Sequence, residues 1–200
     1  MVAGGAGTRM GRPKAGVALG GRTLVDRAVE LLRARCDEVV VVLRPGVPGP
    51  APPARVVHDR PGPACVLAAI ATGLEALSTP RALVLGCDLP FAGPLLDDLL
   101  AVPGAPAAAV GHDGQGPQPL CALYDRAAAL AATEALLDAG RLRARGLPEA
   151  LAAVTVADRH DALANLNDRA DLDRAGGRLD RAYGQGTVTT MSPSSSTCTG

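Results

Sequence analysis

The sequence predicts an α/β fold: a Rossmann-like, open and mostly parallel sheet with helices on both faces. Three observations predict it. Short, continuously apolar runs alternate with longer stretches of helical periodicity, which is the order of a parallel sheet with crossover helices. The 200 residues suffice for one domain with its own core. Because 48% of the residues are hydrophobic but only 2% aromatic, that core must consist mainly of Ala, Val and Leu.

Five apolar runs have the length and composition of buried strands. They cover residues 39–43, 55–58, 82–85, 120–124 and 154–156. Only Met1 and Val2 precede a glycine-rich run, so the first strand, which is normally central in this architecture, has almost no residues. We therefore expect that the true start lies further upstream or that the chain is truncated.

Helical stretches separate these strands, over residues 24–35, 64–77, 94–100 and 126–139. Thr23 is placed to cap the first of them, and a further helix follows Asp168. Residues 45–53 form a proline-rich surface loop, and residues 112–117 form a turn between strands. We expect one domain over residues 1–176 and a disordered tail over 177–200, because its end is rich in Ser, Thr and Gly and lacks periodicity.

Charge and cysteine content exclude several classes of protein. Twenty Lys and Arg balance twenty Asp and Glu, so nothing indicates a nucleic-acid or anionic-membrane partner. The five cysteines show neither a CxxC pair nor the spacing of metal ligands, which is typical of thiols in a reducing compartment. No segment resembles a signal peptide and no apolar run is long enough to span a bilayer. We expect a cytoplasmic protein.

The stretch AGGAGTRMGRPK, residues 3–14, contains Lys14, the only lysine among the twenty Lys and Arg residues. Its glycines allow the backbone to approach a ligand closely, and their N–H groups can bind phosphates. The spacing matches neither GxGxxG nor GxxxxGK[ST], which disfavours a nicotinamide-binding domain and a P-loop NTPase. A compact ammonium can follow a phosphoryl group as charge develops, so Lys14 favours phosphate chemistry over an ordinary surface loop.

Two carboxylates and two amides complete the candidate site. Asp88 follows the run 82–85, at the strand end where open α/β sheets bind ligands, and a carboxylate there can hold Mg²⁺ together with substrate phosphates. Asp59 follows the run 55–58 and precedes a helix, so it could equally answer the helix dipole. Asn165 and Asn167 are the only asparagines, and helix capping is the alternative explanation for them.

Taken together, these segments resemble the molybdenum cofactor guanylyltransferase family of the nucleotidyltransferase superfamily, which has a glycosyltransferase-A-like fold. The family's LAGG-x-[SG]-x-R-M-G…K pattern is matched by residues 2–14, its C-D-x-P-F motif by residues 87–91, and its E-D-x-x-x-G-P segment by residues 58–63. Its N-x-N-[TD] motif is matched by residues 165–168. Several positions depart from the pattern: Pro13 replaces Asp, Val42 replaces an Asn, and Arg169 and Ala170 replace Pro-Glu.

The resemblance implies transfer of GMP from GTP to the phosphate of molybdenum-molybdopterin, with release of pyrophosphate. It implies that Arg9 and Lys14 neutralise the triphosphate and that Asp88 holds Mg²⁺. It further implies that the nucleotide is bound by Val2, Ala3, Gly4, Gly5, Lys14, Asp59, Asp88, Asn165 and Asn167. Molybdoenzymes or their chaperones are the partners that it implies.

Two alternatives stay open on the sequence. Pro13 and Val42 are compatible with a related nucleotidyltransferase that uses CTP or a different small phosphate acceptor. The short first strand and Val42 are also compatible with a nucleotide-binding paralogue without catalysis. Retention of Arg9, Lys14 and Asp88 favours an enzyme over that paralogue.

Overall fold

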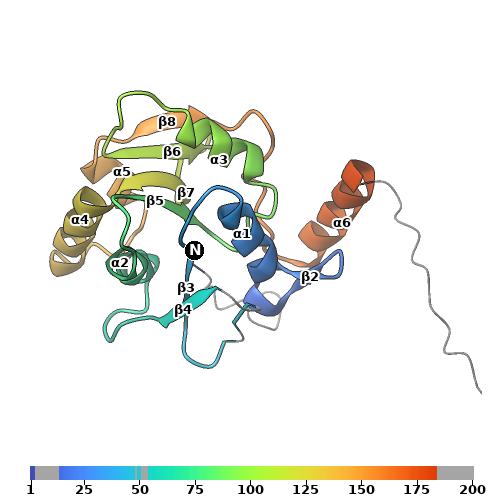
Figure 1. The fold of residues 1–200 in the computed structure, drawn as a ribbon, viewed down its shortest axis with the longest axis horizontal. Coiled ribbons are helices and arrows are strands. Elements are labelled where there is room, and N and C mark those ends of the chain that lie inside the picture. Colours follow the sequence, from blue (N-terminus) through green and yellow to red (C-terminus); the bar gives the residue numbers. More distant parts are fainter. Residues whose placement is uncertain (3–13, 48, 51–53, 184–200) are drawn as a thin grey trace, which may run out of the picture.

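The strands form an open sheet that is joined at Val2 (Figure 1). The computed structural model describes residues 1–2, 14–47, 49–50 and 54–183. In it β3 (Val40–Leu43) pairs in parallel with β4 (Arg55–His58). A four-stranded sheet has the order β5 (Arg81–Leu85), β7 (Pro117–Asp125), β6 (Ala108–His112) and β8 (Val154–Ala157). Val2 bridges in parallel to Val42 of β3 and to Gly86 just after β5.

Most of these strands run parallel, as the sequence predicts. β7 is antiparallel to both of its neighbours, β5 and β6, whereas β8 is parallel to β6. The predicted strands are all present, each within a few residues of its expected bounds. β6 is an addition, because the alanines of its sequence AAVGH have low strand propensity and hide the strand pattern. The small hairpin of β1 (Ala18–Leu19) and β2 (Arg22–Thr23) is likewise an addition.

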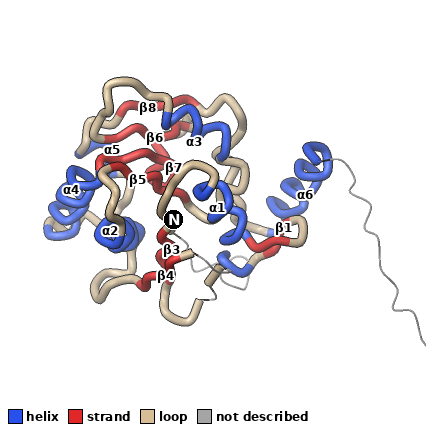
Figure 2. Tube along the Cα trace, in the orientation of Figure 1, coloured by secondary structure: helices blue, strands red, loops and turns tan. Residues whose placement is uncertain are grey.

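Helices cover both faces of the sheet, as Figure 2 shows. α1 (Leu24–Arg33) and α3 (Gly93–Leu100) pack on one face. α2 (Val66–Ala76), α4 (Arg126–Asp138) and the short α5 (Gly146–Ala150) pack on the other. Successive side chains of a strand point to opposite faces. In β5, Leu83 and Leu85 therefore enter the core beneath α1 and α3, while Ala82 and Val84 enter the core beneath α2 and α4.

Two polar side chains define where helices begin. The Thr23 Oγ1 accepts a hydrogen bond from the Asp26 backbone N–H at 3.1 Å, which confirms the predicted cap of α1. The Asp125 Oδ1 accepts one from the Ala128 N–H at 2.9 Å at the start of α4. Among the described residues, no helix combines the length and the apolar character that a membrane span requires.

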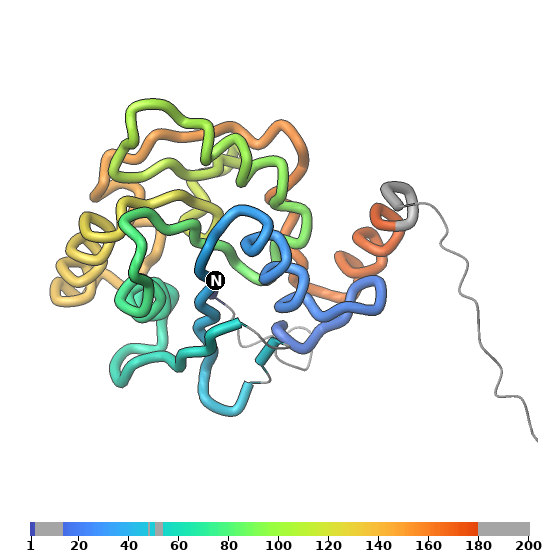
Figure 3. Tube along the Cα trace, in the orientation of Figure 1, coloured from blue at the N-terminus to red at the C-terminus, as the bar shows by residue number. Residues whose placement is uncertain are grey.

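The C-terminal helix α6 (Arg169–Tyr183) passes the domain boundary expected at residue 176. Residues 177–183 are thus helical, and the expectation of disorder from 177 onward is wrong for them; residues 184–200 lie outside the described part. Leu172 and Leu179, two turns apart on one face of α6, pack against Leu19 and Leu24. Figure 3 shows α6 lying beside the β1–β2 hairpin rather than over the sheet. The pair Gly176-Gly177 obscured this periodicity in the sequence.

Candidate active site

The carboxyl ends of β3, β4 and β5 meet at one edge of the sheet, next to Val2. A cavity of about 200 Å³ lies there, lined by Val2, Lys14, Arg44, Asp59, Cys65, Val66, Ala69, Cys87, Asp88 and Leu120. A larger cavity of about 310 Å³ lies at the amino ends of β3 and β5, and its lining is mainly apolar. We assign the chemistry to the smaller one, because it brings together two cations and two carboxylates at the edge where such sheets bind ligands.

Lys14 is the centre of the polar contacts at this edge. Its Nζ donates to the Asp88 Oδ2 at 2.9 Å and to the Asn167 Oδ1 at 2.8 Å. The Lys14 side chain is only 14% exposed and that of Asp88 23%. The lysine opens the short 3₁₀ helix η1 (Lys14–Gly16), whose Ala15 is fully buried. The ammonium is therefore held by the fold rather than by a flexible surface loop.

A backbone contact joins the asparagine segment to Asp88. The Leu166 N–H donates to the Asp88 carbonyl oxygen at 3.1 Å, and Leu166 is buried with Leu19 and Leu24. The structure thus brings together Lys14, Asp88 and Asn167, which lie far apart in the chain. Asn165 is exposed and, within the described part of the chain, is not among the residues that line the cavity.

Gly86 sets the position of the Asp88 carboxylate. Its N–H donates to the Leu120 carbonyl oxygen at 2.8 Å, which extends the β5–β7 pairing by one residue. A Cβ atom on Gly86 would lie 2.7 Å from the Asp88 Oδ1. A larger residue here would force the Asp88 carboxylate, whose other oxygen accepts from Lys14, to shift.

Asp59 occupies the other side of the cavity. Its backbone N–H donates to the Leu43 carbonyl oxygen at 3.1 Å, so the residue is fixed directly after β4. Its Oδ1 is buried and, in the part of the chain that the structure describes, has no hydrogen-bond partner. Burial raises the pKa of the Asp59 carboxyl above its usual range, while the nearby Arg44 guanidinium opposes that rise. A buried acceptor of this kind is suited to a ligand that supplies a donor.

Arg44 is a cavity residue that the sequence prediction missed. It follows β3 at the sheet edge and faces the same cavity as Asp59. The available signal was its place as the first charged residue after an apolar strand. Val42, at which the family's asparagine is replaced, instead packs in the core beneath α2, near Gly73. At the end of β3, the polar side chain that lines the cavity is therefore that of Arg44.

Four of the predicted site residues lie in the cavity, namely Val2, Lys14, Asp59 and Asp88. Ala3, Gly4, Gly5 and Arg9 fall outside the described residues. Among the described residues, no group of three His, Cys, Asp or Glu side chains could hold a metal ion by itself. Mg²⁺ commonly takes only one or two carboxylates plus substrate phosphates, and Asp88 with a bound triphosphate fits that pattern.

The family model that matches this chain assigns its open α/β sheet, with the lysine–aspartate pair at the ligand-binding edge, to the nucleotidyltransferases. The family model described as the MobA-like NTP transferase domain matches residues 1–167, and the chain belongs to that family.

Curated relatives agree with this family. A protein of Chloroflexus aggregans named probable molybdenum cofactor guanylyltransferase is 38% identical over 151 residues, covering 72% of each chain. A Mycobacterium avium protein of the same name is 34% identical over 190 residues, covering 86% of this chain and 91% of the relative.

Two crystal structures share the fold. Molybdopterin-guanine dinucleotide biosynthesis protein A from Archaeoglobus fulgidus has a TM-score of 0.72 at 22% identity, covering 90% of this chain and 97% of that one. 2-C-methyl-D-erythritol 4-phosphate cytidylyltransferase from Thermus thermophilus has a TM-score of 0.71 at 23% identity, covering 89% and 96%. At such identities the likeness is evidence for the fold alone.

Proposed function

We propose that this protein transfers GMP from GTP to the phosphate of molybdenum-molybdopterin, forming the guanine dinucleotide form of the molybdenum cofactor and releasing pyrophosphate. The observation that carries the proposal is the Lys14–Asp88 pair in the cavity, in a chain whose curated relatives are named molybdenum cofactor guanylyltransferases. In the transfer, an oxygen of the acceptor phosphate forms a bond to the α-phosphorus of GTP. The bond from that phosphorus to the bridging oxygen breaks, and pyrophosphate leaves with the bond's electrons.

The residues contribute mainly position and charge. An ammonium has three donors, and within the described residues Lys14 directs two of them to Asp88 and Asn167, which leaves one for a phosphate oxygen. The acceptor phosphate is already a nucleophile, so no general base is needed. Mg²⁺, when bound, would neutralise charge on the phosphate oxygens, and Asp88 is the residue that would hold it. Catalysis of this kind depends on positioning and electrostatic stabilisation.

The choice of GTP rests on Asp59. Its buried Oδ1 lacks a donor, and guanine presents two neighbouring donors, the N1–H and the N2 amino group. Cytosine presents only one, its N4 amino group. Pro13 and Val42, which depart from the family's pattern, keep CTP as the second candidate substrate.

The same proposal includes delivery of the product to molybdoenzymes or their chaperones. It also includes a cytoplasmic location and Mg²⁺ as the cofactor. Free thiols at Cys36, Cys65, Cys87 and Cys121 support a reducing compartment.

Calorimetry in the presence of Mg²⁺, with GTP, CTP, ATP and UTP, tests the proposal. We expect GTP to bind most tightly and Asp88→Ala to weaken that binding. Asp98→Ala, which removes a carboxylate of α3 outside the cavity, is the matched control and is expected to bind GTP normally. Preference for CTP would assign the protein to the cytidylyl branch, and no nucleotide binding would refute the enzyme.

The transfer rate provides a second test. We expect Lys14→Ala and Asp88→Ala each to lower the rate of pyrophosphate release by about a hundredfold or more, as for loss of one preorganised charge-stabilising group. Lys14→Arg retains the charge but not the compact ammonium, and its rate is expected to lie between those of wild type and Lys14→Ala. A normal rate in Lys14→Ala would contradict the role given to this lysine.

A further inference from the structure

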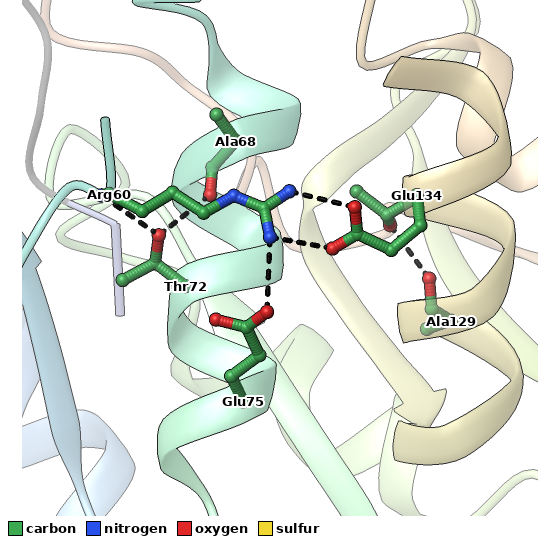
Figure 4. Close-up of polar contacts among 7 residues, drawn as sticks. Arg60, Ala68, Thr72, Glu75, Ala129 and Glu134 are labelled. Carbon is green, nitrogen blue, oxygen red and sulfur yellow. Dashed lines mark hydrogen bonds and ion pairs between the residues drawn. The ribbon is translucent and has the colours of Figure 1, made fainter. Parts of the chain in front are cut away.

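Arg60, the residue after Asp59, makes a set of contacts that the proposed reaction does not use. Its guanidinium binds both oxygens of Glu134 on α4, with Nη1 2.7 Å from Oε1 and Nη2 2.9 Å from Oε2. Nη1 also donates to the Glu75 Oε1 of α2 at 3.0 Å. Figure 4 shows the Arg60 side chain lying between the two helices. Such a paired arginine–carboxylate contact fixes direction as well as distance.

The backbone of Arg60 is also anchored. Its N–H donates to the Thr72 Oγ1 at 3.4 Å, and that hydroxyl donates in turn to the Ala68 carbonyl oxygen at 2.9 Å (Figure 4). Thr72 is a buried polar residue of α2. Arg60 is thus held by one bond to α2 through its backbone and by three through its side chain to α2 and α4.

These contacts of Arg60 lie next to the Asp59 carboxylate, whose buried oxygen is not held by a hydrogen bond within the described residues. In the described part of the chain the Oδ1 of Asp59 is buried without a partner, and the residue's backbone N–H donates to the Leu43 carbonyl oxygen. Beyond Arg60 the chain continues through Pro61, Gly62 and Pro63 before α2 begins at Val66. Without Arg60, the first fixed point after the Asp59 backbone would be several residues further along this loop.

We propose that Arg60 is a positioning residue, which holds the Asp59 carboxylate against the bound nucleotide through its paired contact with Glu134. The inference rests on the proposed function in that Asp59 faces the nucleotide. Arg60 itself does not belong to the cavity lining. The side chains of Arg60 and Glu134 are 29% and 38% exposed, and because the contact is paired and shared with Glu75 it also contributes to fold stability.

Hydrogen exchange without nucleotide tests whether Arg60 holds the segment after β4 in place. We expect Arg60→Met to increase amide exchange over residues 59–65 while leaving the strand residues 55–57 protected. Arg55→Met is the matched control, since Arg55 opens the same strand and pairs with Glu38, away from the cavity. It should leave residues 59–65 unchanged. Unchanged exchange over 59–65 in Arg60→Met would overturn the inference, whether or not the chain binds GTP.

Steady-state kinetics tests whether the contacts of Arg60 affect GTP binding. We expect Arg60→Met to raise the KM for GTP by about tenfold with a much smaller change in kcat, since displaced positioning groups cost up to about a hundredfold. Arg60→Lys keeps the charge but cannot make the bidentate contact, and its KM for GTP should lie between those of wild type and Arg60→Met. Arg55→Met should keep the wild-type KM. A general loss of stability would not produce this separation.

A double-mutant cycle shows whether Arg60 acts through Glu134. We expect Glu134→Ala to raise the KM, and Arg60→Met/Glu134→Ala to raise it no further than Arg60→Met alone. Additive effects, or a KM in Arg60→Met equal to that of wild type, would overturn the inference while leaving GTP binding by wild type intact. Failure of wild type to bind GTP would instead refute the proposed function.

Discussion

At the scale of single residues, Gly86 determines whether the Asp88 carboxylate can reach Lys14. A Cβ at this position would lie 2.7 Å from the Asp88 Oδ1, closer than such atoms can approach. We expect Gly86→Ala to turn the carboxylate away from the lysine and to lower kcat/KM by about tenfold or more. Gly176→Ala, where a Cβ meets nothing within 4 Å, is the control and should leave activity unchanged. Equal activity of both variants would show that the carboxylate can move without loss.

The Asp59 carboxylate should lower the stability of the folded protein at neutral pH while it contributes to GTP binding. Burial raises its pKa above the ordinary value of 3.8, so the folded state holds this proton more tightly than the unfolded state. Stability therefore falls as the pH rises from the unfolded pKa through the folded one. We expect Asp59→Asn to raise the Tm at pH 7, with a gain that shrinks as the pH falls toward 4, and to weaken GTP binding.

Asp97→Asn is the control of opposite sign for that experiment. The Arg35 hydrogen bond lowers the pKa of Asp97, so this carboxylate stabilises the folded state above its unfolded pKa. Its removal should lower the Tm at pH 7 without affecting GTP binding. If Asp59→Asn lowered the Tm as well, burial of the ionised Asp59 carboxylate would not destabilise the folded state.

The residues of the site were predictable where the motif itself places them at a strand end. Asp59 and Asp88 follow β4 and β5, and their convergence with Lys14 follows from the parallel order of those strands. Arg44 was not predictable in the same way, because the motif directs attention to Val42. A shift of two residues along a strand end changes an inward-facing core position into a cavity position.

At the scale of elements, α4 depends on the cap at its first turn. The Asp125 Oδ1 accepts from the Ala128 N–H, which would otherwise be unpaired. We expect Asp125→Ala to lower the free energy of unfolding by about 1 kcal/mol, within a range of roughly 0.5–2 kcal/mol. Asp125→Asn retains a capping oxygen and should lose much less. Urea titration of the three proteins decides between these outcomes.

Strands and helices were predictable from apolar periodicity, and the failures have physical causes. In β6 alanine replaces the β-branched residues that mark a strand, yet the strand forms because β7 and β8 flank it. In α6 two adjacent glycines interrupt the pattern, yet packing of Leu172 and Leu179 with the β1–β2 hairpin region extends the helix. Both are cases in which tertiary contacts override local propensity.

At the scale of the whole molecule, the cavity is shared by the β3–β4 pair and the sheet that begins at β5. A ligand in it contacts both parts and should resist their separation on unfolding. At 100 times the Kd, binding adds about 2.7 kcal/mol, which is roughly 5–10 °C in Tm for a chain of this size. We expect GTP with Mg²⁺ to produce this rise and UTP to produce little. A GTP-independent Tm, measured by calorimetric scanning, would contradict nucleotide binding.

The bond from Lys14 to Asn167 spans 153 positions of the chain, and that from Lys14 to Asp88 spans 74. Contacts of such separation form slowly, because the loop entropy is lost before the contact is gained. During synthesis the lysine can meet the aspartate long before the asparagine has emerged. The nascent chain can thus assemble most of its sheet while the amide partner of its lysine is still missing, and the polar contacts of Lys14 are complete only after Asn167 has been synthesised.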